Sequence, residues 1–260
     1  MAETTQKQIA ADAHDEKVDS DEQPFLSHLI ELRARILRGL VTVLVLFFPI
    51  YFFSQELYTF VAAPLMASLP DGGNMIATDV ATPFITPLKL SIYAALFAGM
   101  PILLHQIWSF VSPGLYLHEK KFAVPLLVSS ITLFYLGMAF AYYIVFPVIF
   151  AFMAAIAPEG VTMMTDISRY LDFVLKMFFA FGFAFEIPIA TLLMVWSGIS
   201  TADSLARKRP YLIVGCFVLG MLLTPPDVVS QLLLAIPMWI LFEVGVFFAR
   251  FIEQRDQNMT

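Results

Sequence analysis

Long uninterrupted apolar runs are the feature that most constrains this chain. Of its 260 residues, 59% are hydrophobic and only 14% are charged. A soluble domain of this length does not need so much apolar surface, and the runs are long enough to cross a bilayer as helices. A membrane β-barrel would instead show short segments of alternating polarity. The chain is therefore predicted to be an all-α, polytopic membrane protein.

Six apolar segments are marked along the chain as predicted transmembrane helices. Basic residues cluster before the first segment and in alternate loops, which predicts that those loops and both termini are cytoplasmic. The predicted spans cover residues 36–53, 88–110, 122–146, 170–196, 211–224 and 228–249. The basic residues are Arg33, Arg35, Arg38, Lys120, Lys121, Arg207, Lys208, Arg209, Arg250 and Arg255.

The fifth and sixth spans are expected to be short and to thin the bilayer locally. Only 14 residues separate Pro210 from Pro225. A helix of that length rises about 21 Å against a hydrocarbon core of about 30 Å. The sixth span is interrupted by Pro237 and contains Gln231 and Glu243.

Prolines inside four spans remove helix hydrogen bonds and favour bends, which predicts a concave, cup-like bundle. The long loops at 54–87 and 147–169 are expected to form short amphipathic helices on the outer interface. The four prolines are Pro49, Pro101, Pro188 and Pro237.

The two ends of the chain are expected to lie outside a membrane domain of residues 24–252. Residues 1–23 carry a charge of −5 and no aromatic residue, so they are predicted to form a disordered cytoplasmic tail. They lack the layout of a cleavable signal peptide. Residues 253–260 are predicted to form a second cytoplasmic tail. The single cysteine, Cys216, excludes an intramolecular disulfide.

Carboxylates at the membrane edges and inside the spans are the candidate functional groups. Glu31 and Arg35 either form an ordinary i,i+4 pair, worth about 0.3–0.5 kcal/mol, or Glu31 meets a cation from another molecule. Glu119 is either a solvated acid at a helix start or a second such group. Glu186 lies mid-span, where a carboxylate is costly. It is either a hydrogen-bonded structural group or a polar lining for water or substrate.

Asp172 and Lys176 fall on one helical face, and an intrahelical pair with a snorkelling lysine is favoured over a proton relay. The sequence contains no phosphate-binding, H-E-x-x-H or G-x-S-x-G motif, no Cys/His metal spacing and no basic stripe for nucleic acid. We therefore expect no enzymatic activity, no cofactor, no metal and no nucleic-acid partner. A small-solute transporter is opposed by the missing internal repeat, and an intramembrane enzyme by the missing nucleophile–base set.

A series of short stretches, in their order and spacing, resembles the TatC family, the multi-spanning core subunit of the twin-arginine protein translocase. The resemblance covers about residues 24–252, including all six spans. The matching stretches include HLIELRARIL, AAPL, MIATDVATPF, FVSPGLYLHEKK, VPLLVSSITLFYLGMAFAYY, APEGV, AFGFAFEIP, RKRPY, GMLLTPPDVVSQ and AIPMWILFEVGVFFARF.

The resemblance implies a receptor and scaffold in the bacterial cytoplasmic (inner) membrane that binds the twin-arginine signal peptides of folded cargo proteins. Proteins of this family act with the single-span partners TatA and TatB, with several copies in each complex, and transport uses the proton-motive force. The fifth span is where the family contacts TatB. The acidic tail 1–23 is longer than the family pattern needs, and Lys176 stands where an apolar residue is expected.

The family's motif positions, carried onto this chain, suggest roles for particular residues. Glu31 and Glu119 resemble the carboxylates that receive the two signal-peptide arginines, and guanidinium–carboxylate pairs are strong and directional. Arg33 and Phe110 resemble further members of that cytoplasmic site. The other matching positions are the intramembrane or partner-docking residues Glu186, Met221 and Gln231, and the outer-loop residues Pro64 and Asp227.

Overall fold

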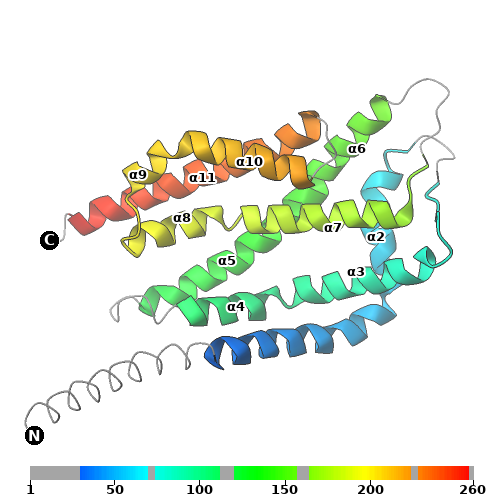
Figure 1. Cartoon of the computed structure of the whole chain (residues 1–260), viewed down its shortest axis with the longest axis horizontal. Coiled ribbons are helices and arrows are strands. Elements are labelled where there is room, and N and C mark those ends of the chain that lie inside the picture. The colour runs from blue at the N-terminus through cyan, green and yellow to red at the C-terminus, as the bar shows by residue number, and fades with distance from the viewer. Residues whose placement is uncertain (1–29, 70–73, 112–119, 157–163, 224–227, 258–260) are drawn as a thin grey trace, which may run out of the picture.

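The computed structural model describes residues 30–69, 74–111, 120–156, 164–223 and 228–257, and their regular elements are helices (Figure 1). The first helix covers Ile30–Phe52. The others are α2 (Ser54–Met66), α3 (Thr82–Ala98), α4 (Met100–Val111), α5 (Lys120–Phe140), the π-helical turn η3 (Ala141–Val145), α6 (Phe146–Ala155), α7 (Ile167–Ala184), α8 (Ile187–Trp196), α9 (Ala202–Arg207), α10 (Arg209–Leu223) and α11 (Val228–Gln257).

Four helical segments of the described chain are long and apolar enough to cross a membrane: Ile30–Phe52, Val124–Ala155, Ile167–Trp196 and Val228–Phe251. A fifth crossing is formed by α3 and α4 if the pair, bent by 50°, counts as one span. The remaining apolar helix is α10, and its 15 residues confirm that the fifth predicted span is short. That all six cross the membrane, and the cup shape, stay predictions.

The prediction of a short sixth span is wrong. Its apolar stretch, Val228–Phe251, has 24 residues, and α11 continues to Gln257, beyond the boundary drawn at residue 252. The helix runs through Pro237 without ending, because neighbouring helices support a proline-interrupted segment inside a membrane protein. Glu243 does not interrupt it either, because that carboxylate is paired with Arg209.

The helices run back and forth along the long axis of the molecule (Figure 1). One end, here called the basic end, holds the start of Ile30–Phe52, the end of α4, the start of α5, α9 and the end of α11. The opposite end holds α2, the starts of α3 and α7, and the end of α6. The described basic residues of the predicted cytoplasmic loops thus lie together, as an alternating path requires. Which side of the membrane they face stays a prediction.

Among the described residues of the loop at 147–169, the predicted interfacial helix does not form as a separate element. Instead, α5 continues through η3 into α6, and Pro147 stands in the first turn of α6. A proline cannot donate the helix hydrogen bond and its ring crowds the preceding turn, so a π turn before it relieves the clash. In the other long loop, residues 54–66 do form a helix, α2.

Two tyrosines of the α5–η3 segment satisfy carbonyl groups that prolines leave without a helical donor. Pro64 has no N–H to give the Phe60 carbonyl, and the Tyr142 hydroxyl donates to that oxygen at 2.7 Å. Pro101 likewise leaves the Phe97 carbonyl without a helical donor, and this oxygen accepts a hydrogen bond from the Tyr135 hydroxyl at 2.9 Å. The tyrosines therefore fix α2 and the α3–α4 bend to the centre of the bundle.

Glycines allow the central helices to approach closely. A Cβ on Gly137 of α5 would stand 2.3 Å from the Phe181 carbonyl oxygen of α7. A Cβ on Gly245 of α11 would stand 2.0 Å from the Thr191 hydroxyl of α8. Small residues at such crossings let helix backbones touch in membranes. Around them lie fully buried side chains, among them Phe134, Phe146 and Phe181.

We expect Tyr142→Phe to destabilise the protein by about 1–2 kcal/mol, because the Phe60 carbonyl then loses its donor. The matched control is Tyr143→Phe, since Tyr143 is 69% exposed. The measurement is denaturant unfolding in detergent. In a Pro64→Ala background the alanine N–H serves the same carbonyl, so Tyr142→Phe should cost less there. Equal costs in both backgrounds would contradict the assignment.

Candidate functional site

At the basic end, Arg35 links the first helix to the C-terminus of α4. Its guanidinium pairs with Glu31 one turn earlier, with Nε 3.1 Å from Oε1. It also donates to the carbonyl oxygens of Gln106, at 3.4 Å, and Ser109, at 3.1 Å. The Ser109 carbonyl lies in the last turn of α4, where the helix presents its negative pole, and Gln106 lies one turn earlier. The intrahelical pair considered in the sequence is thus present, and Arg35 has further partners.

The two sides of this pair differ in exposure. The Arg35 side chain is 16% exposed, whereas that of Glu31 is 43% exposed. Arg33 is exposed on another face of the same helix, and Phe110 is half-buried at the end of α4, next to Ser109. Of the four residues predicted for this site, the structure places Glu31 and Phe110 on the two elements that Arg35 joins. Glu119 lies outside the described residues.

Inside the membrane domain, Glu186 occupies the break between α7 and α8. Phe185 and Glu186 form a two-residue turn just before Pro188, which begins α8 and cannot continue the helical ladder. The Glu186 carboxyl meets the Ser130 hydroxyl of α5, and Ser130 also accepts from the Trp108 indole of α4 at 3.2 Å. The other carboxyl oxygen, Oε1, is buried without a hydrogen-bond partner. The bend predicted from Pro188 is present, and it leaves a polar group at the junction of α4, α5, α7 and α8.

Gln231 and Met221 lie on neighbouring helices and differ in exposure. The Gln231 side-chain amide donates to the Phe217 carbonyl of α10 at 2.8 Å, so it connects α11 to the short α10. Met221 is 62% exposed on α10. Gln231 is therefore at least partly structural, and Met221 offers an exposed contact surface.

The outer-loop residue Pro64 acts on the backbone of α2, as described above for the Phe60 carbonyl. Asp227 lies outside the described residues. Close to α2, Asp166 begins α7 and accepts hydrogen bonds at 2.7–3.0 Å from the backbone of Thr78, Ser168 and Arg169 and from the Thr78 hydroxyl. These bonds hold the pKa of Asp166 at about 2. The bonds from Thr78 could not be predicted from the sequence, because Thr78 and Asp166 are 88 residues apart.

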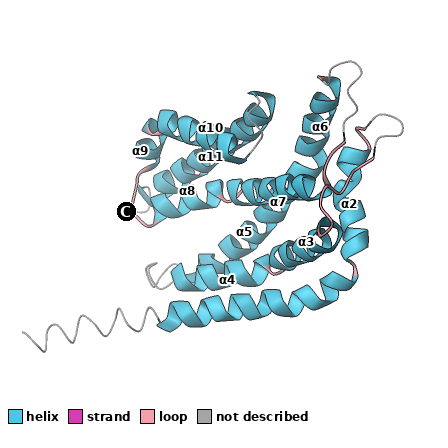
Figure 2. Cartoon of the chain, turned by 45° about the vertical axis from the view of Figure 1, so that its right-hand side comes forward, coloured by secondary structure: helices cyan, strands magenta, loops and turns pink. Residues whose placement is uncertain are grey.

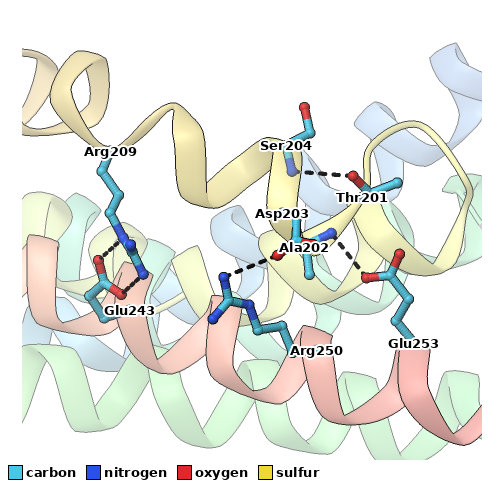
Figure 3. Close-up of polar contacts among 8 residues, drawn as sticks. All are labelled: Thr201, Ala202, Asp203, Ser204, Arg209, Glu243, Arg250 and Glu253. Atoms are coloured by element: carbon cyan, nitrogen blue, oxygen red, sulfur yellow. Dashed lines mark hydrogen bonds and ion pairs between the residues drawn. The ribbon is translucent and has the colours of Figure 1, made fainter.

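Five charged side chains make contacts between α9, α10 and α11 (Figure 3). Arg209 binds both oxygens of Glu243, at 2.6 and 2.7 Å. About two turns after Glu243 on α11, Arg250 pairs with Asp203 of α9 at 3.1 Å. Glu253, further along α11, accepts a hydrogen bond from the Ala202 N–H at 3.2 Å. This network fastens α9 to α11. An acid inside the sixth span beside a basic loop was the signal in the sequence that Glu243 has a cationic partner.

The pairing expected between Asp172 and Lys176 is wrong. Asp172 forms its ion pair with Lys89 of α3. The carboxylate lies on the side of α7 that packs against α3, whereas Lys176 is exposed. Packing of the two helices therefore brings a lysine from another span within reach of Asp172.

Acid should loosen the Asp166 clamp. Its pKa of about 2 is below the ordinary value of 3.8, so its stabilising effect is complete above pH 4 and is lost as the pH falls to 2. We expect the thermal unfolding midpoint to fall over this range, and Asp166→Asn to lower the midpoint at neutral pH and flatten its acid dependence. The control is Asp79→Asn, because Asp79 is exposed and lies next to Thr78 in the loop before α3. An unchanged acid profile in Asp166→Asn would contradict the clamp.

Comparison with known proteins gives consistent results. Residues 27–237 match the model of the family described as Sec-independent protein translocase protein (TatC). The TatC protein of Azotobacter chroococcum mcd 1 is 58% identical over 92% of this chain and 94% of its own length. TatC of Escherichia coli strain K12 is 54% identical over 92% of each chain. A crystal structure of the twin arginine translocase receptor TatC superposes with a TM-score of 0.78, at 35% identity, over 86% of this chain and 98% of that one.

Proposed function

Because the chain belongs to the TatC family of Sec-independent protein translocase components, we propose that it is the receptor that binds twin-arginine signal peptides of folded proteins. In this proposal the basic end faces the cytoplasm and the protein lies in the inner membrane. TatA and TatB join it, several copies assemble, and the proton-motive force drives export. The chain itself is a multi-pass membrane protein and part of a protein translocase.

The Glu31–Arg35 pair is the observation that carries this proposal. Glu31 already binds a guanidinium, yet its side chain is 43% exposed, so a second guanidinium can approach it from outside. Arg35 keeps the Gln106 and Ser109 carbonyls as partners if Glu31 turns to an incoming arginine. The Arg35 guanidinium then keeps two carbonyl acceptors in place of its carboxylate, which limits the cost of separating a largely buried ion pair.

A second arginine requires a second acid at the same end. Glu119 directly precedes Lys120, the first residue of α5, and α5 packs against α4, the helix that Arg35 contacts. Phe110 at the end of α4 supplies an aromatic surface, and Arg33 an exposed cation. We assign all four residues to the signal-peptide site.

Replacing either acid should weaken binding selectively. Glu31→Gln or Glu119→Gln removes one charge-assisted contact, which is worth roughly 10- to 100-fold in affinity for a twin-arginine peptide. Binding of a twin-lysine peptide should barely change, because an ammonium lacks the bidentate fork. The measurement is peptide titration of the purified protein. Glu56→Gln serves as the control, since Glu56 is exposed on α2 at the opposite end. Equal losses for both peptides would refute the site.

We assign the residues inside the membrane to a later step, the docking of partner helices. Glu186, with its buried Oε1 lacking a partner, offers a hydrogen-bonding group, and Met221 lies on the exposed surface of α10. Gln231 holds α10 in place through the Phe217 carbonyl. The outer-loop residues Pro64 and Asp227 are assigned to maintaining the opposite end.

Glu186→Gln separates the two steps. We expect peptide affinity to stay within about twofold of wild type, a free-energy change of about 0.4 kcal/mol, whereas transport of a folded reporter weakens several-fold. Binding is measured by titration, and transport in inverted membrane vesicles with TatA and TatB present. Normal transport in this variant would show that Glu186 has a structural role only.

A further inference from the structure

A lysine without an ion-pair partner among the described residues lies on the apolar segment Ile167–Trp196. Lys176 is exposed, nine positions after Ile167, which corresponds to about 13 Å along the helix axis in a hydrocarbon core of about 30 Å. Its neighbour one turn earlier, Asp172, is already paired with Lys89. The two lysines and one aspartate, on neighbouring parts of α3 and α7, therefore carry a combined charge of +1. Cations at such depth are rare and usually face a partner group.

The surface around Lys176 is formed by two helices that run side by side (Figures 1 and 2). Two contacts join α3 to α7 beside Lys176. One is the Lys89–Asp172 ion pair, and the other is the edge-to-face contact of Tyr93 with Phe179, whose ring centroids are 5.7 Å apart. The helical spacing puts Ile85 and Ile92 on the exposed side of α3, and Phe183 lies two turns after Lys176 on α7. These apolar side chains are 49%, 45% and 50% exposed.

We propose that this α3–α7 face binds a transmembrane helix of a partner protein that carries one acidic side chain at the depth of Lys176. Charge complementarity requires one carboxylate. The partner must be helical, because a chain that enters the hydrocarbon has to satisfy its own backbone hydrogen bonds. The exposed side chains of Ile85, Ile92 and Phe183 then pack against the apolar side chains of the partner helix.

The other possible occupants fit less well. A phospholipid phosphate lies at the interface, about 13 Å away along α7 from Lys176. A second copy of this chain brings acids in its described spans that are already in ion pairs, Glu31 with Arg35, Asp172 with Lys89 and Glu243 with Arg209. The remaining one, Glu186, lies at the helix junction with its Oε1 buried and is assigned above to another docking step.

The test uses the full chain in zwitterionic vesicles and synthetic Leu-Ala transmembrane peptides, followed by energy transfer. One peptide carries a single Glu about nine residues from its outer end, and its match carries Gln. We expect the Glu peptide to bind about tenfold more tightly, the size of one interhelical polar contact. Moving the Glu by two turns should remove the preference.

Substitutions of Lys176 then test whether this side chain causes the preference for the Glu peptide. Lys176→Gln should make the two peptides equal, and Lys176→Glu should transfer the preference to a peptide with Lys at that position. Lys208→Gln is the matched control, because Lys208 is an exposed lysine at the basic end. Equal binding of Glu and Gln peptides to the wild type would overturn the proposal. In a second set of vesicles that contain phosphatidylglycerol, a Lys176→Gln variant that changes only the amount of this lipid bound would also overturn the proposal. No signal peptide is used, so the outcome is independent of peptide recognition.

Discussion

The fold depends on satisfying backbone carbonyl groups where water is absent. An apolar environment offers them no alternative partner, so a proline inside a helix creates an acceptor that another part of the protein must serve. The α5–η3 segment serves two of them with hydroxyl groups seven residues apart: Tyr135 bonds the Phe97 carbonyl at the α3–α4 bend, and Tyr142 bonds the Phe60 carbonyl in α2. A bent helix pair and a short helix at the opposite end are thereby held by one central element. The close contact of Gly137 with Phe181 then locks that element against α7.

The same requirement shapes the basic end. The last four carbonyls of α4 have no helical donors, and Arg35 of the first helix donates to one of them, Ser109, as well as to Gln106 one turn earlier. Arg35 thus has a structural duty that is separate from its ion pair with Glu31. Because the guanidinium is anchored on α4, the Glu31 carboxylate is kept in position, partly exposed and already suited to a guanidinium. In our proposal, the contacts of Arg35 with α4 therefore also hold Glu31 in place for an arginine of the signal peptide.

The sequence predicted most of the helices but few of their partners. Apolar runs located the helices, although the first and second begin six residues before the predicted spans, the third extends to Ala155 and the sixth to Gln257. The breaks near Pro101 and Pro188 lie where the prolines predicted them. The length of α11 was missed, because Pro237 and Glu243 were treated as interruptions although the bundle supports both. The Lys89–Asp172 pair, the Asp166 clamp and the two tyrosine donors join residues far apart in the chain, and periodicity within one helix carries no information about them. Glu31 was recognisable because an acid at a basic membrane edge conflicts with local charge patterning.

The central claim is that an incoming arginine replaces Arg35 at Glu31 while Arg35 stays on α4. The most direct measurement is a structure of the full chain with a bound twin-arginine signal peptide. We predict a peptide guanidinium within hydrogen-bonding distance of Glu31, and Arg35 still on the carbonyls of Gln106 and Ser109. An intact Glu31–Arg35 pair, with both peptide arginines bound elsewhere, would contradict the account.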